Sequence, residues 1–418
     1  MNNQQHKSDA LLARTLGLIL AALFSNSASA IDTTEQTDTE CLLNWGHTFL
    51  PELFSPAVSG LQYLAPYTYR YYPNTNAYVG VSDIDNHVYY MGPNDVMPQD
   101  AGDLPYWLGQ SGCGVKPYPV IFVHGIASSA DIWMPYSDYL ANNSYWSFGG
   151  IPAYNPGTNA VEISCPVGAN SACSADTGDF YALNFSNNQH LSFEAQGGEL
   201  AAVISAVLQA NPGKTKVILV SHSMGGLAAR QYLQGLAREP NGNPIGYRDD
   251  VAKLITVGTP HKGSFWAEQC HNNIDIFDFF GFTANVGACK LLSLPIDKNS
   301  VAIVDLQPGS TALNTLNDVA SHPLPASVSY VSIIGAGQST WSGIVDFIDG
   351  DGIVSDHSQD LVNAIGNQPL PHYAVKMNIP FRECGNKINI PLVGDVGQTH
   401  SCEPTDLGVW AEIFKNVH

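Results

Sequence analysis

The stretch from Val217 to Tyr232 constrains the fold of this chain more than any other. Four apolar residues, 217–220, precede Ser221-His222-Ser223-Met224-Gly225, and a helix-like run follows to Tyr232. A buried strand, a tight turn around a serine and a helix form the elbow that presents a nucleophile at the end of a strand. The residues two before and two after the central serine must be small. Gly225 meets this need, and so does Ser221, which stands where glycine is usual. We therefore predict that Ser223 is a nucleophile at a helix N-terminus, where developing negative charge is stabilised.

A serine hydroxyl is a weak nucleophile, so Ser223 needs a histidine as its base and a carboxylate to hold that histidine. With an elbow of this kind, the acid and then the histidine follow the serine in the chain. His400 lies in a polar loop, 397–401, just before the last predicted helix, and Cys384 and Cys402 flank this loop. We predict His400 as the base. His372 is the main alternative, since His357 lies too close to the predicted acid loop.

The acid is expected on a loop after a late strand. The segment 346–354 follows the strand predicted over 328–334, and it holds Asp351 between two glycines. We predict Asp351 as the acid, with Asp349 and Asp356 as alternatives. The same carboxylates could instead bind calcium, although they lack the spacing of an EF-hand loop.

Two backbone N–H groups are needed to stabilise the oxyanion that forms during attack on a carbonyl. One is predicted to be that of Met224, directly after the nucleophile. The other should follow the first buried strand, 120–123, whose end is His124-Gly125-Ile126. We predict the Ile126 N–H as the second donor.

The chain is expected to have three parts. Residues 1–30 have two basic residues, an apolar run and a small-x-small end, which predicts a secretory signal peptide. Residues 31–116 form an N-terminal β-rich extension, with strands expected near 67–72, 77–81 and 87–91. From 117 to 418, strands alternate with helices, as in an α/β domain. Strands are expected at 120–123, 181–185, 217–220 and 253–257, and helices at 193–210 and 404–417. Residues 264–300 interrupt the alternation and are predicted to be a cap or lid, with an ordinary packed loop as the alternative.

The cysteines indicate the cellular compartment, and the net charge limits the class of binding partner. All eight cysteines follow the predicted signal peptide, which favours disulfides. Nearness in sequence suggests three pairs and leaves a fourth: Cys165–Cys173, Cys270–Cys289, Cys384–Cys402 and Cys41–Cys113. The formal net charge of −20 argues against nucleic-acid binding. No later segment is apolar for long enough to cross a membrane, so we expect no transmembrane segment in the mature chain and a secreted or periplasmic protein.

Four motifs stand in the order seen in secreted bacterial lipases: 119–126, the elbow at 221–226, 258–264 and 351–354. Over roughly residues 117–415 the chain resembles this α/β-hydrolase lipase family. The resemblance implies a mostly parallel central sheet with flanking helices, and hydrolysis of carboxylic esters through an acyl-enzyme. Carried over by position, it implies Ser223 as nucleophile, Asp351 as acid and His400 as base. No cofactor is implied, although some relatives bind a structural calcium.

The expected substrate is an acyl ester or lipid such as a triacylglycerol, met at an oil–water interface. Three other functions stay open from the sequence. A polyester depolymerase and an acyltransferase would use the same nucleophile. A non-catalytic, hydrolase-like binding protein would keep the fold without the reaction.

Overall fold

The computed structural model describes residues 62–64, 67–72, 77–82, 87–91, 99–103, 116–143, 146–166, 173–272, 288–292, 294–342, 347–366, 368–382, 384–390 and 394–417. The predicted signal peptide and the predicted Cys41–Cys113 bond lie outside these residues. The chain divides into two compact units, Met1–Val115 and Lys116–His418.

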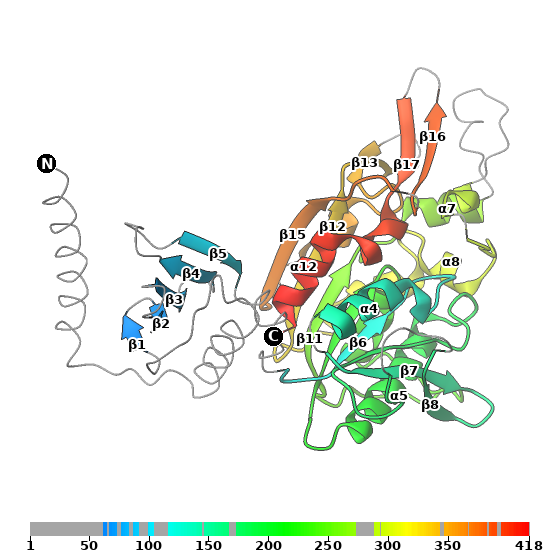
Figure 1. Ribbon diagram of the computed structural model, residues 1–418. Coiled ribbons are helices and arrows are strands. Elements are labelled where there is room, and N and C mark those ends of the chain that lie inside the picture. Colours follow the sequence, from blue (N-terminus) through cyan, green and yellow to red (C-terminus); the bar gives the residue numbers. More distant parts are fainter. Residues whose placement is uncertain are drawn as a thin grey trace, which may run out of the picture. The chain divides into compact units, whose positions relative to one another are not determined.

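The first unit contains a five-stranded antiparallel sheet whose spatial order follows the chain (Figure 1). Its strands are β1 (Gln62–Leu64), β2 (Tyr67–Tyr72), β3 (Ala77–Ser82), β4 (His87–Met91) and β5 (Gln99–Asp103). The β-prone runs noted in the sequence form β2, β3 and β4. Antiparallel neighbours with short connections make a simple meander.

The second unit is built on an eight-stranded sheet in the order β15-β12-β11-β10-β6-β9-β7-β8. Neighbours pair in parallel except β7 and β8, which form an antiparallel edge. The bounds are β6 (Val120–Val123), β7 (Phe148–Asn155), β8 (Ala160–Ser164), β9 (Phe180–Ala182), β10 (Val217–His222), β11 (Val251–Val257), β12 (Ser329–Ala336) and β15 (His372–Asn378). The predicted fold class, an α/β-hydrolase fold with a mostly parallel sheet, is confirmed.

Both faces of this sheet are covered, which explains why its central strands are continuously apolar. Alternate residues of β6 point to opposite faces. Ile121 and Val123 pack with helix α5 (Phe193–Ala210) and helix α6 (Gly225–Leu233). Val120 and Phe122 pack with helix α4 (Met134–Asn143) and helix α12 (Leu407–Asn416), which lie together in Figure 1. Each side chain buried in this way stabilises the fold by about 1.5–3 kcal/mol.

Shorter elements connect the sheet to the loops beyond the carboxyl ends of its strands. The helices are η1 (Ala130–Trp133), α7 (Phe265–His271), η3 (Ala288–Leu292), α8 (Val301–Asp305), α9 (Thr311–Asn317), α10 (Asp356–Gln359), α11 (Leu361–Ile365) and η4 (His400–Thr405). Two hairpins add β13 (Gln338–Trp341) with β14 (Phe347–Gly350), and β16 (Asn386–Ile390) with β17 (Gly394–Gln398). Three disulfides join Cys165 to Cys173, Cys270 to Cys289 and Cys384 to Cys402, the pairs that nearness in sequence suggested.

Several predicted elements differ from those observed. The strand expected at 181–185 is β9, and it ends at Ala182. The helix expected at 404–417 is divided, because the Asp406 side chain accepts the Gly408 and Val409 N–H groups and starts α12 afresh. The predicted cap or lid at 264–300 is described only at α7, η3 and 294–300. In the described part of the chain, no helix has both the length and the apolar character that spanning a membrane requires.

Candidate active site

Ser223 lies at the sharp turn between β10 and α6. Its φ of +54° is left-handed, which a non-glycine residue adopts only where the surroundings hold it. The Ser223 N–H donates to Val257 O at 2.8 Å, which anchors the turn to the next strand. A Cβ at Gly125 would lie 2.7 Å from the Ser223 Cβ, so the loop after β6 passes directly beside the serine. The elbow predicted from the sequence therefore has the expected strand, turn and helix.

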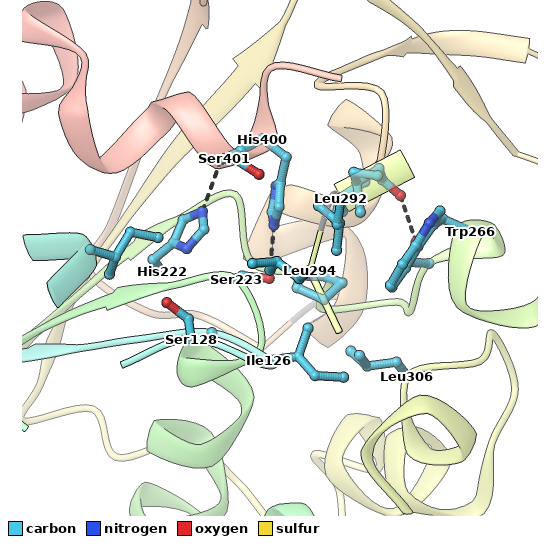
Figure 2. Close-up of a pocket in the computed structure, with 16 residues that line it drawn as sticks. Ile126, Ser128, His222, Ser223, Trp266, Leu292, Leu294, Leu306, His400 and Ser401 are labelled. Carbon is cyan, nitrogen blue, oxygen red and sulfur yellow. Dashed lines mark hydrogen bonds between the residues drawn. The ribbon is translucent and has the colours of Figure 1, made fainter. Parts of the chain in front are cut away.

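The structure brings the three predicted catalytic residues together from distant parts of the chain. The Ser223 Oγ lies 2.8 Å from His400 Nε2, a contact that Figure 2 shows. His400 Nδ1 lies 2.7 Å from Asp351 Oδ2. Ser223 begins the elbow turn directly after β10, His400 begins η4 and Asp351 follows β14. All three side chains are buried. We call this arrangement the Ser223–His400–Asp351 chain.

Asp351 is held by donors on both oxygens. Its Oδ1 accepts the N–H groups of Ile353 at 2.8 Å and Val354 at 2.7 Å. Its Oδ2 accepts the Gln359 side-chain amide at 3.0 Å as well as His400. A carboxylate that only accepts will bind the Nδ1–H tautomer of His400, which leaves Nε2 free to accept the Ser223 proton. The sequence reasoning did not single out Gln359.

The alternative acids and bases lie elsewhere. Asp349 and Asp356 each lie 2.7 Å from the Lys376 ammonium. His372 lies in β15, with Nε2 3.0 Å from Ser332 Oγ, and His357 lies 3.1 Å from the Lys262 ammonium. None of these groups reaches Ser223. Since the Lys376 ammonium bridges Asp349 and Asp356, calcium bound between these carboxylates would have to displace it.

The two predicted oxyanion donors flank Ser223. Ile126 shares a pocket with Ser223, and Met224 follows it directly. Among the described residues, none accepts a hydrogen bond from the backbone N–H of Ile126 or Met224. Both N–H groups are therefore available to an oxyanion formed at Ser223.

The sequence reasoning also missed two buried titratable groups beside His400. The Nε2 of His222 lies 3.1 Å from His400 O, and the two imidazole centroids are 4.7 Å apart. The Oε2 of Glu403 lies 3.6 Å from His400 Nδ1 and 3.3 Å from His222 Nε2. These three side chains also have the spacing of metal ligands, but His400 Nδ1 is already engaged by Asp351.

A largely apolar pocket opens at Ser223 (Figure 2). Trp266 and Leu292, from α7 and η3, form part of its wall, and the Cys270–Cys289 disulfide joins these two helices. The other apolar lining residues include Ile126, Ile132, Leu294, Leu306, Ile353 and Val354. An apolar pocket at a nucleophile suits a substrate whose reacting group carries a hydrocarbon chain.

Part of the chain is similar to known proteins. Residues 115–291 match the model of the PGAP1-like alpha/beta domain. A triacylglycerol lipase of Pseudarthrobacter phenanthrenivorans is 31% identical over 153 residues, 36% of this chain and 35% of that protein. A triacylglycerol lipase of Burkholderia plantarii is 31% identical over 153 residues, 36% of this chain and 32% of that protein. The match spans about a third of the length of these relatives.

A solved structure from Listeria innocua, the product of the gene lin2722, is 15% identical with a TM-score of 0.42 and covers 71% of this chain and 92% of that one. The sheet order and elbow described above give the second unit an α/β-hydrolase fold, and part of the chain is similar to triacylglycerol lipases.

Proposed function

We propose that this α/β hydrolase cleaves carboxylic esters, with triacylglycerols or other acyl esters as substrates, through an acyl-enzyme on Ser223. The single observation that carries the proposal is the Ser223–His400–Asp351 chain, whose two hydrogen bonds measure 2.8 and 2.7 Å. The apolar pocket beside Ser223 accommodates the acyl chain of such a substrate. The lipases that share 31% identity with part of the chain support the same substrate class.

The reaction follows from the positions of these groups. His400 Nε2 takes the Ser223 proton as Oγ attacks the ester carbonyl carbon. The Ile126 and Met224 N–H groups bind the resulting oxyanion, and each such donor typically contributes about 3–4 kcal/mol. His400 then returns the proton to the departing alcohol, and water removes the acyl group by the same route. Asp351 orients His400 and stabilises its imidazolium form.

The test compares p-nitrophenyl esters of graded acyl length for the wild type, Ser223→Ala and His400→Ala. We expect both variants to lose at least about a thousandfold in kcat, since the serine and its base act together. Ser205→Ala is the matched control, because Ser205 lies in α5 and its hydroxyl bonds only Ala201 O. Equal rates for the wild type and Ser223→Ala would disprove the assignment.

The alternative functions are outcomes of the same experiment. Release of alcohol esters rather than free acid, when an alcohol acceptor is added, would identify an acyltransferase. Faster attack on polyester films than on emulsified triglycerides would identify a depolymerase. Failure of an organophosphate to label Ser223 would leave a non-catalytic binding protein.

We also propose that the chain is exported and that residues 264–300 act as a cap over the pocket. The signal-like sequence of residues 1–30 supports export. The contribution of Trp266 and Leu292 to the pocket wall supports the cap. Fractionation of cells that express the full chain tests export, and a mature N-terminus near Ile31 in the periplasm or medium is the expected result.

A further inference from the structure

We propose that Asn188 is a positioning residue for ester hydrolysis, because its side-chain amide holds the Gly125–Ile126 peptide so that the Ile126 N–H faces the oxyanion. The inference rests on the proposed function and deepens it, since it assigns the group that prepares one oxyanion donor. Asn188 lies between β9 and α5, far from the motifs that the sequence displays.

Asn188 bonds the loop after β6 at two points. Its Nδ2 donates to Gly125 O and, at 3.3 Å, to Ser128 O. Ala127, between these two carbonyl groups, has a φ of +50°. A left-handed non-glycine residue costs of order 1 kcal/mol or more and persists only where neighbouring contacts hold it. The Asn188 amide therefore fastens this strained loop on both sides of Ala127.

The bond to Gly125 O bears directly on the oxyanion donor. The carbonyl of Gly125 and the N–H of Ile126 belong to one planar, trans peptide, in which the C=O and N–H bonds point in opposite directions. Fixing the carbonyl oxygen therefore fixes the direction of the Ile126 N–H. Hydrogen bonds accepted by the oxygen also polarise the peptide and make its N–H a stronger donor.

His124 supplies a second bond to the same oxygen. Its Nε2 lies 3.3 Å from the Phe185 N–H and accepts from it, so the ring proton is on Nδ1, which lies 2.9 Å from Gly125 O. Burial lowers the pKa of His124 to about 4, so the ring stays neutral. The Asn188 amide nitrogen also lies 3.1 Å from His124 Nδ1, but both atoms are donors in this tautomer, so this contact is not a hydrogen bond.

Asn188 is itself held in place. Its side chain is 8% exposed. The buried Gln196 amide donates to Asn188 O at 3.3 Å and to Leu191 O at 3.0 Å. Because this amide is buried and its backbone is held, it keeps its partner in position, and no free energy is lost to reordering the amide in each turnover.

The experiment measures transition-state binding separately from substrate binding. Asn188→Ala removes the amide but leaves the His124 bond to Gly125 O, so that oxygen keeps a partner. We expect kcat to fall about tenfold to a hundredfold, less than the loss of a whole oxyanion donor, with KM within about twofold of the wild type. The inhibition constant of a trifluoromethyl ketone, which forms an oxyanion on Ser223, should rise by the same factor as kcat falls. The matched methyl ketone should bind unchanged.

Asn187→Ala is the control, because Asn187 is exposed and its side chain accepts only the His190 N–H. Asn188→Asp should lower kcat more than Asn188→Ala does, since a negative carboxylate would face the carbonyl oxygens of Gly125 and Ser128. If that variant does not fold, Asn188→Ala decides alone.

Two failures are distinguishable. A wild type that neither hydrolyses esters nor reacts with an organophosphate overturns the proposed function. If the wild type is active, two results would overturn only the inference about Asn188. One is that Asn188→Ala keeps its kcat, and the other is that both ketones lose affinity equally.

Discussion

The Nε2 of His222 lies 3.3 Å from Oε2 of Glu403, and both side chains are buried directly behind His400. Burial, followed by the charge of Asp351, raises the pKa of Glu403 well above its usual range. Burial, followed by the charge of His400, lowers the pKa of His222. Both shifts favour the uncharged forms of the pair, a protonated carboxyl group and a neutral imidazole. A neutral pair leaves Asp351 as the charged partner of His400.

Glu403→Gln should change the pH dependence of stability. An acid whose pKa is raised by folding binds more protons in the folded protein, so the unfolding free energy falls as pH rises above the ordinary value of 4.5. Glutamine is neutral at every pH and removes this decrease. We expect the stability of Glu403→Gln relative to the wild type to increase from pH 4 to pH 8, as measured by urea unfolding. A constant difference across that range would mean that folding does not shift the pKa of Glu403.

Asp351→Asn should abolish most activity without unfolding the protein. The asparagine Oδ1 can still accept the Ile353 and Val354 N–H groups, so the loop keeps its two short bonds. Its amide nitrogen would instead donate to His400 Nδ1, and the ring proton would move to Nε2. A protonated Nε2 can no longer accept the proton of Ser223. We expect kcat to fall about 10⁴-fold, with the melting temperature little changed. Asp349→Asn, on the neighbouring exposed carboxylate, is the control, and a similar loss there would contradict the assignment.

Gly335→Ala should destabilise the protein through Glu403. A Cβ at Gly335 would lie 2.0 Å from Glu403 Oε1, and a contact of this kind costs about 1–3 kcal/mol in a packed interior. Glu403→Ala vacates that space, so the two substitutions should couple in a double-mutant cycle. Gly246→Ala is the control, since no atom lies within 4 Å of the added Cβ. Strict additivity of the Gly335 and Glu403 effects would show that the two groups do not share this space.

Removing the Cys270–Cys289 disulfide should alter both stability and acyl preference. The bond closes a sequence separation of 19 residues, and its loss costs about 3 kcal/mol in the loop-entropy account. It also joins the helices that carry Trp266 and Leu292, and the Trp266 Nε1 donates to Ala288 O at 2.6 Å. We expect Cys270→Ala/Cys289→Ala to melt earlier and to show a higher KM for long-chain p-nitrophenyl esters.

The matched control for that experiment is Cys165→Ala/Cys173→Ala. This disulfide lies near β8, and neither cysteine lines the pocket. It should lower stability with no change in acyl preference. A change of preference in both double variants would point to a general loosening of the fold.

Chelation should leave the protein unaffected. The carboxylates of Asp349 and Asp356, which the sequence suggested as calcium ligands, are each 2.7 Å from the Lys376 ammonium. The carboxylate oxygens of Asp351 already accept hydrogen bonds from the Gln359 amide, from His400 and from two backbone N–H groups. We expect the same melting temperature and esterase rate with EDTA and with added calcium. A lower melting temperature in EDTA, restored by calcium, would reveal a metal site outside these carboxylates.

The sequence indicated the parts of the fold that rest on local patterns. The apolar runs at 120–123 and 217–220 predicted buried strands, and the 3.6-residue period of 193–210 predicted α5 to its ends. By contrast, β15 was not predicted, because it is a sheet edge whose residues are mostly exposed or half-buried. Its strand character depends on pairing with β12 rather than on apolar side chains.

The same division holds for the site. The elbow and the glycines around Asp351 are visible in the sequence because steric limits at a turn select small residues. The order serine–acid–histidine is also read directly along the chain. Glu403, Gln359, Asn188 and Lys376 carry no such mark, because each matters through a partner that no local sequence pattern identifies. The separations along the chain include 8 residues for Gln359 and Asp351 and 63 for Asn188 and Gly125. Only packing of the sheet and its loops decided which polar side chains share a buried space, because burial and proximity, and with them the charge states, are properties of the folded chain.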